Sequence, residues 1–252
     1  MSDRFSEEQI QRYARHIVLS EVGGTGQAKL TQSSALVVGT GGLGSPAALY
    51  LAAAGIGTLG IVDYDRVELS NLQRQILHFT PDVGRLKTDS AKDKLTALNP
   101  EVEIKPHQIK LTAQNAVDLV RGYDVVIGAL DTFEPRYHLN DACVKTGTPL
   151  VEAGVLRFEG LLMTVVPGRG PCYKCVFPQV PSGSSVPTCA EVGVIGALPG
   201  TLGTLQAMEA IKVLLDIGTP MVGRLLIVDA LHLSFKEVKV EADPACTVCG
   251  RS

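Results

Sequence analysis

The chain has no excess of either charge and no long hydrophobic run, and its first residues are not typical of a leader segment. Its net charge is −3 over 252 residues, so the composition gives no sign of a nucleic-acid or membrane partner. No apolar run reaches the roughly 20 residues that span a bilayer, and the opening residues, MSDRFSEEQ, are too polar for a signal peptide. These absences predict a cytoplasmic protein. At 45% hydrophobic and 19% charged residues, the chain is expected to form one α/β domain with a large core.

Cysteine is scarce, yet four of the six cysteines form two C-x-x-C pairs, Cys172/Cys175 and Cys246/Cys249. This spacing lets two thiolates bind one tetrahedral metal ion from a tight turn. Because 71 positions separate Cys175 from Cys246, the pairs predict a zinc clasp that ties the C-terminal tail to a mid-chain loop, and not a compact zinc ribbon. Thiols stay reduced in the cytosol, which favours metal ligation over disulfides; spare thiols or redox chemistry are the alternative. Cys143, inside a predicted helix, is expected in the core.

Strands and helices alternate through residues 33–154, the predicted nucleotide-binding core. Strands are predicted near 34–39, 58–63, 102–105, 124–130 and 149–153, with helices near 44–54, 87–98, 113–120 and 136–145. Alternation of this kind predicts a Rossmann-like, mostly parallel sheet with helices on both faces. Beyond it, residues 155–252 contain predicted strands at 161–166, 224–229 and 234–240 and a helix at 199–215. We expect these later strands to extend the sheet in antiparallel fashion.

Two further segments stand outside this alternation. Ser6 and Gln9 match a capping box and precede apolar residues at helical spacing, which predicts a helical arm within residues 1–30. Arg12 and Arg15 lie off the apolar stripe, where a solvated basic face is the ordinary interpretation. Residues 178–187 are rich in Pro, Gly and Ser and predict a mobile loop.

A glycine-rich segment follows the first predicted strand of the core. Gly39, Gly41 and Gly44 match G-x-G-x-x-G before a helix, a context that predicts nucleotide phosphates at the helix N-terminus. Asp63 comes 19 residues after Gly44, where a carboxylate commonly binds a ribose hydroxyl. By itself this pattern fits NAD as well as ATP.

Polar residues beyond the second strand favour ATP. The segment Ser70-Asn71-Leu72-Gln73-Arg74-Gln75 and then Lys87 supply two cations and several amides. A triphosphate needs such cations and a metal ion, whereas the pyrophosphate of a dinucleotide is bound largely by the glycine loop. Any one of these residues could instead belong to an ordinary polar helix face.

Taken together, the motifs resemble those of a known family. G-T-G-G-L-G, D-x-D-x-V-x-x-S-N-L-x-R-Q, G-x-x-K, D-x-x-x-x-R-Y and both C-x-x-C pairs are similar to those of the ubiquitin-activating-enzyme-like adenylyltransferases, the MoeB/ThiF family, and most of all to the molybdopterin-synthase adenylyltransferases. The resemblance covers essentially residues 1–252 as one adenylation domain. It implies ATP-dependent activation of the C-terminal Gly-Gly carboxylate of a small ubiquitin-fold sulfur-carrier protein (MoaD-like or ThiS-like). The product would be an acyl-adenylate, with release of pyrophosphate, for molybdopterin, thiamine or tRNA-thiolation sulfur transfer.

The resemblance also implies roles for individual residues. Asp63 would hold the ribose, Asn71, Arg74 and Lys87 the phosphates, and Asp131 a Mg²⁺ ion. Arg15 would reach the ATP site of the partner subunit in a homodimer. The full set expected at the ATP site is Gly39, Gly41, Gly42, Gly44, Asp63, Asp65, Ser70, Asn71, Leu72, Gln73, Arg74, Gln75, Lys87, Asp131 and Thr132. Residues 155–252 would bind the carrier as well as zinc.

The chain departs from the family pattern near Asp131. Thr132 replaces the usual Asn, and Gly128 replaces an acidic residue, which leaves Asp131 as the metal carboxylate, with Glu134 as a weaker candidate. Cys189 matches the family's conjugating cysteine, but no histidine is near it in the sequence to activate a thiolate, so its catalytic role stays open. Because the chain ends just after the second cysteine pair, without the rhodanese domain of longer relatives, a separate sulfur donor such as a cysteine desulfurase or rhodanese is expected.

Two other classes of function compete with this interpretation. An NAD-dependent oxidoreductase with a structural zinc is disfavoured by Arg74 and Lys87 and by the lack of a recognisable hydride-transfer constellation. A non-catalytic scaffold of the same fold is disfavoured because the set of polar residues from Asp63 to Asp131 is intact. Carrier-dependent pyrophosphate exchange is expected only from the adenylyltransferase.

Overall fold

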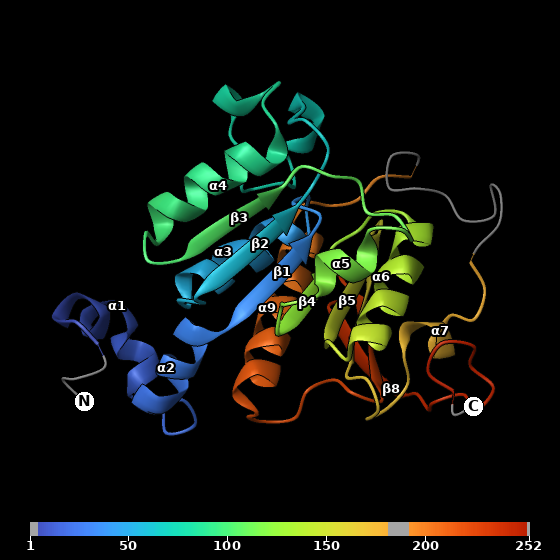
Figure 1. Cartoon of the computed structure of the whole chain (residues 1–252). Helices are drawn as coiled ribbons and strands as arrows, with labels where there is room; N and C mark the ends of the chain where they lie inside the picture. Colours follow the sequence, from blue (N-terminus) through green and yellow to red (C-terminus); the bar gives the residue numbers. More distant parts are fainter. Residues whose placement is uncertain (1–4, 181–191, 251–252) are drawn as a thin grey trace.

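The computed structural model describes residues 5–180 and 192–250 and contains one eight-stranded sheet (Figure 1). The strands lie in the order β3-β2-β1-β4-β5-β6-β7-β8. Their bounds are β1 Ser34–Val38, β2 Thr58–Val62, β3 Glu103–His107, β4 Val125–Gly128, β5 Leu150–Leu156, β6 Glu159–Val165, β7 Arg224–Asp229 and β8 Ser234–Lys239. The predicted mixture of a parallel core and an antiparallel extension is confirmed.

The parallel half runs from β3 to β5. β1 pairs with β2 on one side and with β4 on the other, so Val38 lies opposite both Val62 and Gly128. The chain first builds outward to β3 and then returns to add β4 and β5. In open sheets of this kind, the crevice beyond the carboxyl ends of the two strands at the reversal is the usual place for a ligand. The fold therefore places a site next to Val38 and Gly128.

The antiparallel half begins where β5 turns back into β6, with Leu150 opposite Val165. β6 then pairs with β7, and β7 pairs with β8, which lies at the edge of the sheet. The side chains of β8 are exposed apart from that of Val238, which is partly buried. This half is therefore covered less completely than the parallel half.

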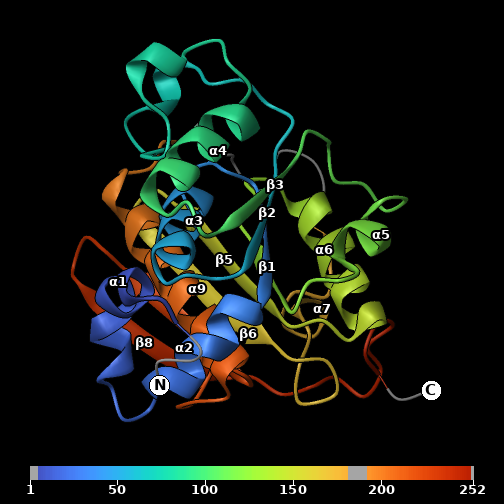
Figure 2. The ribbon, with the colours of Figure 1, turned by 60° about the vertical axis from the view of Figure 1, so that its left-hand side comes forward.

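Helices cover both faces of the parallel half (Figure 2). The described helices are α1 Glu7–Ile17, α2 Gly23–Gln32, α3 Gly44–Ala53, α4 Lys87–Leu98, α5 Ala116–Val120, α6 Phe133–Thr146, α7 Tyr173–Val176 and α9 Ala197–Leu215, with 3-10 turns at Leu69–Asn71 and Thr80–Asp82. α3, α4 and α9 cover one face, and α5, α6 and α7 the other. Val37 packs in the first of these cores and Leu36 in the second, because successive strand residues point to opposite faces.

The N-terminal arm is helical as predicted, and α1 begins with the expected capping box. Gln9 N donates to Ser6 Oγ at 3.1 Å, and Ser6 N donates to Gln9 Oε1 at 2.9 Å. Of the apolar stripe on α1, Tyr13 is buried, but Ile10 and Val18 are 40% and 74% exposed. α1 and α2 lie at the end of the molecule opposite to α7 and the C-terminus (Figure 1).

Most predicted elements are found within a few residues of their expected bounds. Three boundaries differ by three residues: α5 begins at Ala116 instead of 113, α6 begins at Phe133 instead of 136, and β5 ends at Leu156 instead of 153. α2 and α7 were not predicted as separate helices. Cys143 is fully buried, as expected. Most of the loop predicted at 178–187 lies outside the described residues. Among the described helices, none has the length and apolar character needed to cross a membrane.

Candidate functional site

A cavity of about 320 Å³ opens at the carboxyl edge of the parallel strands. It lies where the topology of the sheet predicts a ligand. The lining residues come from the glycine loop, the ends of β2 and β4, the segment around Arg74 and the start of α9. They are Gly39, Gly41, Gly42, Leu43, Asp63, Asp65, Arg74, Gln75, Lys87, Ala129, Leu130, Asp131, Thr132, Arg136, Val155, Val194 and Pro199.

The glycine loop wraps around the ends of β1 and β4 before α3. Gly39 has φ +96°, and a Cβ there would lie 2.5 Å from the carbonyl oxygen of Ala129. Only glycine combines this conformation with so close an approach. Gly44 does not line the cavity, but a Cβ there would lie 1.8 Å from Gly39 O. It closes the turn that carries the loop into α3, whose N-terminus favours bound phosphate.

Asp63 stands at the end of β2 and is 9% exposed. Its Oδ2 accepts hydrogen bonds from Thr40 N and Thr40 Oγ1, each at 2.9 Å, and its Oδ1 accepts one from Asp65 N at 3.0 Å. The carboxylate thus fixes the glycine loop relative to β2 while it lines the cavity. A ribose hydroxyl could bind it only by sharing these oxygens.

Three cations line the cavity, Lys87, Arg74 and Arg136, each from a different segment. Lys87 begins α4, is 6% exposed, and its Nζ lies 3.0 Å from Asp65 Oδ2. Arg74 donates from Nη1 to Ser70 O at 3.1 Å. Asp63, Asp65 and Asp131 also line the cavity, and burial together with these three carboxylates raises the pKa of Tyr64. Oxygen donors close together beside cations suit a Mg²⁺-bound triphosphate.

Asp131 lies in the loop between β4 and α6, and this loop is fastened by Arg136. Arg136 Nη2 donates to the carbonyl oxygen of Leu130, and its Nη1 lies 3.2 Å from Glu152 Oε1 on β5. Arg136 is the arginine of the D-x-x-x-x-R-Y motif, and the sequence alone predicts no role for it. Its link to Glu152 depends on strand pairing and leaves no local pattern in the sequence.

Several predicted site residues do not line the cavity. Ser70, Leu72 and Gln73 are absent from its wall, and so is Asn71, whose Oδ1 accepts from Glu68 N at 3.3 Å. This turn holds the segment that carries Arg74 and Gln75, both of which do line the cavity. Of the six residues predicted from Ser70 to Gln75, two therefore line the cavity and four do not.

A buried histidine supports the glycine loop and was not singled out from the sequence. His78 Nε2 lies 3.1 Å from Thr40 O, and its Nδ1 lies 2.9 Å from Ser90 Oγ. Burial lowers the pKa of His78, so the ring is neutral and can donate to the carbonyl and accept from the hydroxyl. Its position, twelve residues before its partner on α4, matches no recognised motif.

Arg15, one of the predicted catalytic residues, lies away from this cavity. Arg15 is exposed on α1 and, within residues 5–180 and 192–250, forms neither a hydrogen bond nor an ion pair. Its neighbour Arg12, by contrast, donates to Leu98 O at 3.2 Å. Cys189 lies outside the described residues. Arg15 is absent from the wall of the cavity.

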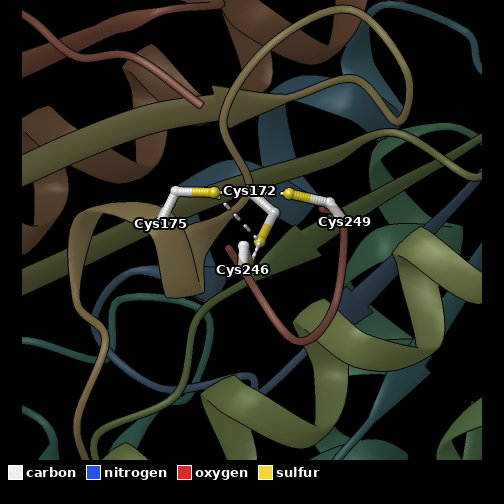
Figure 3. A group of neighbouring side chains, drawn as sticks. All are labelled: Cys172, Cys175, Cys246 and Cys249. Carbon is white, nitrogen blue, oxygen red and sulfur yellow. Dashed lines mark hydrogen bonds between the residues drawn. The ribbon is translucent and has the colours of Figure 1, made fainter. Parts of the chain in front are cut away.

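The four paired cysteines meet beside α7 (Figure 3), at the end of the molecule opposite to α1 in Figure 1. Their sulfur atoms point toward one another and all lie within 4.8 Å. The separations are 3.8 Å for Cys172–Cys175, 3.7 Å for Cys172–Cys246 and 3.3 Å for Cys175–Cys249. A disulfide would require about 2.05 Å. The mid-chain loop and the C-terminal tail are therefore joined as the clasp prediction requires.

The geometry of this cluster fits a tetrahedral metal ion. With Zn–S bonds of about 2.3 Å, neighbouring sulfurs would be about 3.8 Å apart, close to the distances found. For Cys246, burial raises the thiol pKa. Hydrogen bonds from the backbone N–H groups of Cys249 and Val248 and from the neighbouring thiols lower it by more than burial raises it, so that the pKa is about 7. Burial raises the pKa of Cys172 and of Cys249, so these thiols would lose their protons only on metal binding.

Comparison with known proteins agrees with this geometry. The family model described as "ThiF family" matches residues 13–248. A "Sulfur carrier protein adenylyltransferase" from Thermus thermophilus is 47% identical over 98% of this chain and 93% of its own length. A "SAMP-activating enzyme E1" from Haloferax volcanii is 49% identical over 96% of this chain and 89% of its length.

Longer relatives and solved structures extend the comparison. The "Adenylyltransferase and sulfurtransferase MOCS3" of Anopheles gambiae is 47% identical over 99% of this chain, which covers 57% of that protein. The crystal structure of Escherichia coli MccB with ATP has a TM-score of 0.84 over 99% of this chain at 23% identity, a likeness that shows the fold alone. The family model and the closely similar relatives settle membership: the chain belongs to the ThiF family.

Proposed function

We propose that the protein adenylates the C-terminal carboxylate of a small ubiquitin-fold sulfur-carrier protein that ends in Gly-Gly. The observation that carries this proposal is the cavity at the β1/β4 crevice, where Arg74 and Lys87 face Asp63, Asp65 and Asp131 beside the glycine loop. The relative from Thermus thermophilus, which matches almost the whole chain, is named as a sulfur carrier protein adenylyltransferase, and the relative from Haloferax volcanii as an activating enzyme. A nicotinamide site would need a flat apolar slot, whereas this cavity combines cations and carboxylates.

In the proposed reaction, a carboxylate oxygen of the carrier forms a bond to the α-phosphorus of ATP. The bond from that phosphorus to the bridging oxygen breaks, and the electron pair leaves with pyrophosphate. No general base is required, because the attacking carboxylate is already ionised at neutral pH. Lys87 and Arg74 are positioned to stabilise charge that develops on the phosphate oxygens, an effect that typically contributes about 3–4 kcal/mol per donor. A sulfur donor, such as a cysteine desulfurase or rhodanese, would then act on the acyl-adenylate.

Two metal ions belong to this proposal. Asp131 would hold Mg²⁺, which neutralises phosphate charge when it is bound, and the exposed carboxylates of the cavity wall fit this hard cation. The four cysteines would hold Zn²⁺ in a closed shell that leaves no position for water or substrate, as in structural sites. Zinc would thus stabilise the carrier-binding region, residues 155–252, without taking part in the reaction.

We also propose a homodimer that works in the cytoplasm. Arg15, exposed and unpaired among the described residues, would enter the ATP site of the partner subunit. The exposed apolar side chains of Ile10 on the same helix and of Val18, which directly follows it, suit burial between subunits.

The test is isotope exchange between pyrophosphate and ATP. We expect exchange that depends on Mg²⁺ and on a Gly-Gly-ended carrier, and none with a carrier that lacks the last two residues. Lack of exchange with MoaD-like and ThiS-like carriers alike would overturn the proposal. NAD reduction by the protein would favour the oxidoreductase instead.

A further inference from the structure

Glu152 is a buried carboxylate in the middle of β5 and was not selected from the sequence. Its side chain is 2% exposed, and within the described residues neither of its oxygens accepts a hydrogen bond from the protein. Arg136 is its one ion-pair partner in the described part of the chain, with Nη1 at 3.2 Å from Oε1. That contact satisfies the distance for an ion pair but not the geometry of a hydrogen bond. Burying a carboxylate with so few polar partners costs free energy of folding. Its presence in this position therefore indicates a role other than stability.

The backbone leaves room for this ion pair at two glycines on the same face of the sheet. Gly128 lies opposite Glu152 in the β4–β5 register, and a Cβ there would lie 1.8 Å from Glu152 Oε2. At Gly154, a Cβ would lie 2.7 Å from Arg136 Nη1. Larger residues at either position would displace the carboxylate or the guanidinium. The pair therefore occupies a space that the chain has kept open for it.

Arg136 connects the pair to the nucleotide cavity. It lines that cavity, and its Nη2 donates to Leu130 O. Leu130 directly precedes Asp131, so the guanidinium ties the loop that carries Asp131 to β5. A planar guanidinium can hold a carbonyl and a carboxylate at fixed relative positions, as a lysine ammonium cannot.

We infer that Glu152 is a positioning residue of the nucleotide site: its buried carboxylate holds Arg136 so that Leu130 and Asp131 keep the arrangement that binds Mg²⁺–ATP. The inference rests on the nucleotide-binding part of the proposed function. It does not require that a carrier protein be the second substrate.

The surroundings of Glu152 determine how pH acts on this arrangement. Arg136 and Cys143 face it from α6 and Tyr173 from α7, while β4 and β6 contribute Gly128 and Met163. Burial raises the pKa of Glu152 and Arg136 lowers it, with a net rise from 4.5 to about 7. Burial also raises the pKa of Tyr173, to about 12, and that of Cys143, so both stay neutral near pH 7. Within this group, Glu152 is the one that changes charge between pH 5.5 and 8.5.

The directions in which Glu152→Gln changes the melting temperature and the ligand affinity distinguish a positioning role from a structural one. A carboxyl whose pKa is raised on folding binds more protons in the folded state, so its charged form lowers stability as pH rises from about 4.5 to 7. Removing the charge by Glu152→Gln should therefore keep or raise the melting temperature at pH 8. A positioning role predicts the opposite direction for ligand binding, which should weaken in the same variant at the same pH.

The experiment is calorimetric titration of the full-length protein with Mg²⁺–ATP at pH 8.5, 7 and 5.5. For Glu152→Gln we expect a Kd about tenfold higher than that of the wild type at pH 8.5, and a ratio approaching one at pH 5.5, where Glu152 of the wild type is itself protonated. Glu103→Gln is the matched control, since it makes the same change on an exposed side chain of β3 in the same sheet. Its Kd should equal that of the wild type at each pH.

Glu152→Met provides a second variant, which removes the carboxylate and leaves the guanidinium of Arg136 without its ion-pair partner. It should share the weak binding at pH 8.5 and melt below Glu152→Gln, whose amide oxygen can still meet the guanidinium. Wild-type affinity in both variants would overturn the inference, and so would a pH-independent ratio or failure of both variants to fold. Wild-type protein that binds ATP but shows no carrier-dependent exchange would instead overturn the proposed function alone.

Discussion

The parallel half of the sheet, from β3 to β5, lies between helices on both faces, whereas the antiparallel half ends in β8, most of whose side chains are exposed. Polar groups of the first half pair with one another at the carboxyl edge, as in Asp63 with Thr40 and Lys87 with Asp65. The tail beyond β8, up to residue 250, has neither helix nor strand. Its described contacts with the mid-chain loop include the sulfur atoms of Cys246 and Cys249.

This difference suggests that the two halves of the sheet have different functions. The nucleotide cavity is lined by no described residue of the tail, so the parallel half should bind ATP without help from it. The antiparallel half should depend on a metal ion for its shape and should contribute the surface that meets the carrier protein. Substitutions in each half can test these expectations separately.

The largest effect is expected from Cys246→Ser. Loss of one ligand should release zinc, whose binding contributes apparent free energies of about 10–16 kcal/mol in zinc-finger peptides. Even a loss of about 5 kcal/mol would lower the melting temperature by roughly 10–20 °C in a chain of this size. Because the nucleotide cavity lies in the other half, the Kd for Mg²⁺–ATP at 25 °C should change less than about twofold. Zinc content by mass spectrometry and thermal unfolding provide the measurements.

Thr247→Ala changes an exposed residue between the two cysteines and is the control for this variant. It should keep zinc and melt with the wild type. A wild type with no bound zinc would show that the clasp is wrong. If ATP binding is lost together with zinc, the two halves are not independent.

The next largest effect is expected from substitutions of two cations that line the nucleotide cavity in the parallel half. Lys87→Ala and Arg74→Ala should each lower carrier-dependent pyrophosphate exchange about a hundredfold or more, since a fixed donor to a developing charge contributes about 3–4 kcal/mol. Zinc content and melting temperature should stay near wild-type values. Lys92→Ala, on the exposed side of α4, should exchange normally. Near-normal exchange in Lys87→Ala or Arg74→Ala would remove that residue from the phosphate site.

A third pair of substitutions tests whether the nucleotide site of the parallel half is formed by one chain or by two. Arg15→Ala and Asp131→Asn should each be nearly inactive alone, because one lacks the cation given to the partner and the other the metal carboxylate. A mixture of the two should regain up to roughly a quarter of wild-type activity, since half of the dimers are mixed and each mixed dimer has one intact site.

Arg12→Ala mixed with Asp131→Asn is the control, because Arg12 is bonded within its own chain. Arg12→Ala should be active alone and gain nothing from mixing. If Arg15→Ala mixtures stay inactive although mass spectrometry shows subunit exchange, Arg15 does not act across a dimer interface.

Sequence reasoning predicted the parallel half well because its signals are local. The glycine loop, the buried strands and the first residue of α4 each follow from spacing within about a dozen residues. The clasp was also predictable, since C-x-x-C pairs have few other uses in a reduced compartment. In the segment from Ser70 to Gln75, the motif gave the right region, but the backbone turn decides that Arg74 and Gln75 face the cavity.

The features that could not be predicted from the sequence depend on contacts between segments that are distant along the chain. The pair formed by Arg136 and Glu152 exists because Gly128 lies opposite Glu152 in the β4–β5 register. Gly128 looked from the sequence like the loss of an acidic residue, yet the structure places a carboxylate over it from the neighbouring strand. Val155 and Pro199 reach the cavity from strands and helices far along the chain, and no single-sequence pattern reports such a meeting.

The smallest effect is expected at the exposed face of the antiparallel half. Phe235 on β8 is 51% exposed, and Leu231 and Leu233, at 63% and 78%, lie in the turn just before it. If these apolar side chains meet the carrier, Phe235→Ser should raise the KM for the carrier about fivefold, the equivalent of about 1 kcal/mol of lost burial. The KM for ATP and the melting temperature should hardly change. Lys236→Ser alters the next residue, whose side chain points to the opposite face of the strand, and should leave both KM values unchanged. Equal carrier KM values for the two variants would place the carrier elsewhere and leave the antiparallel half with a structural role alone.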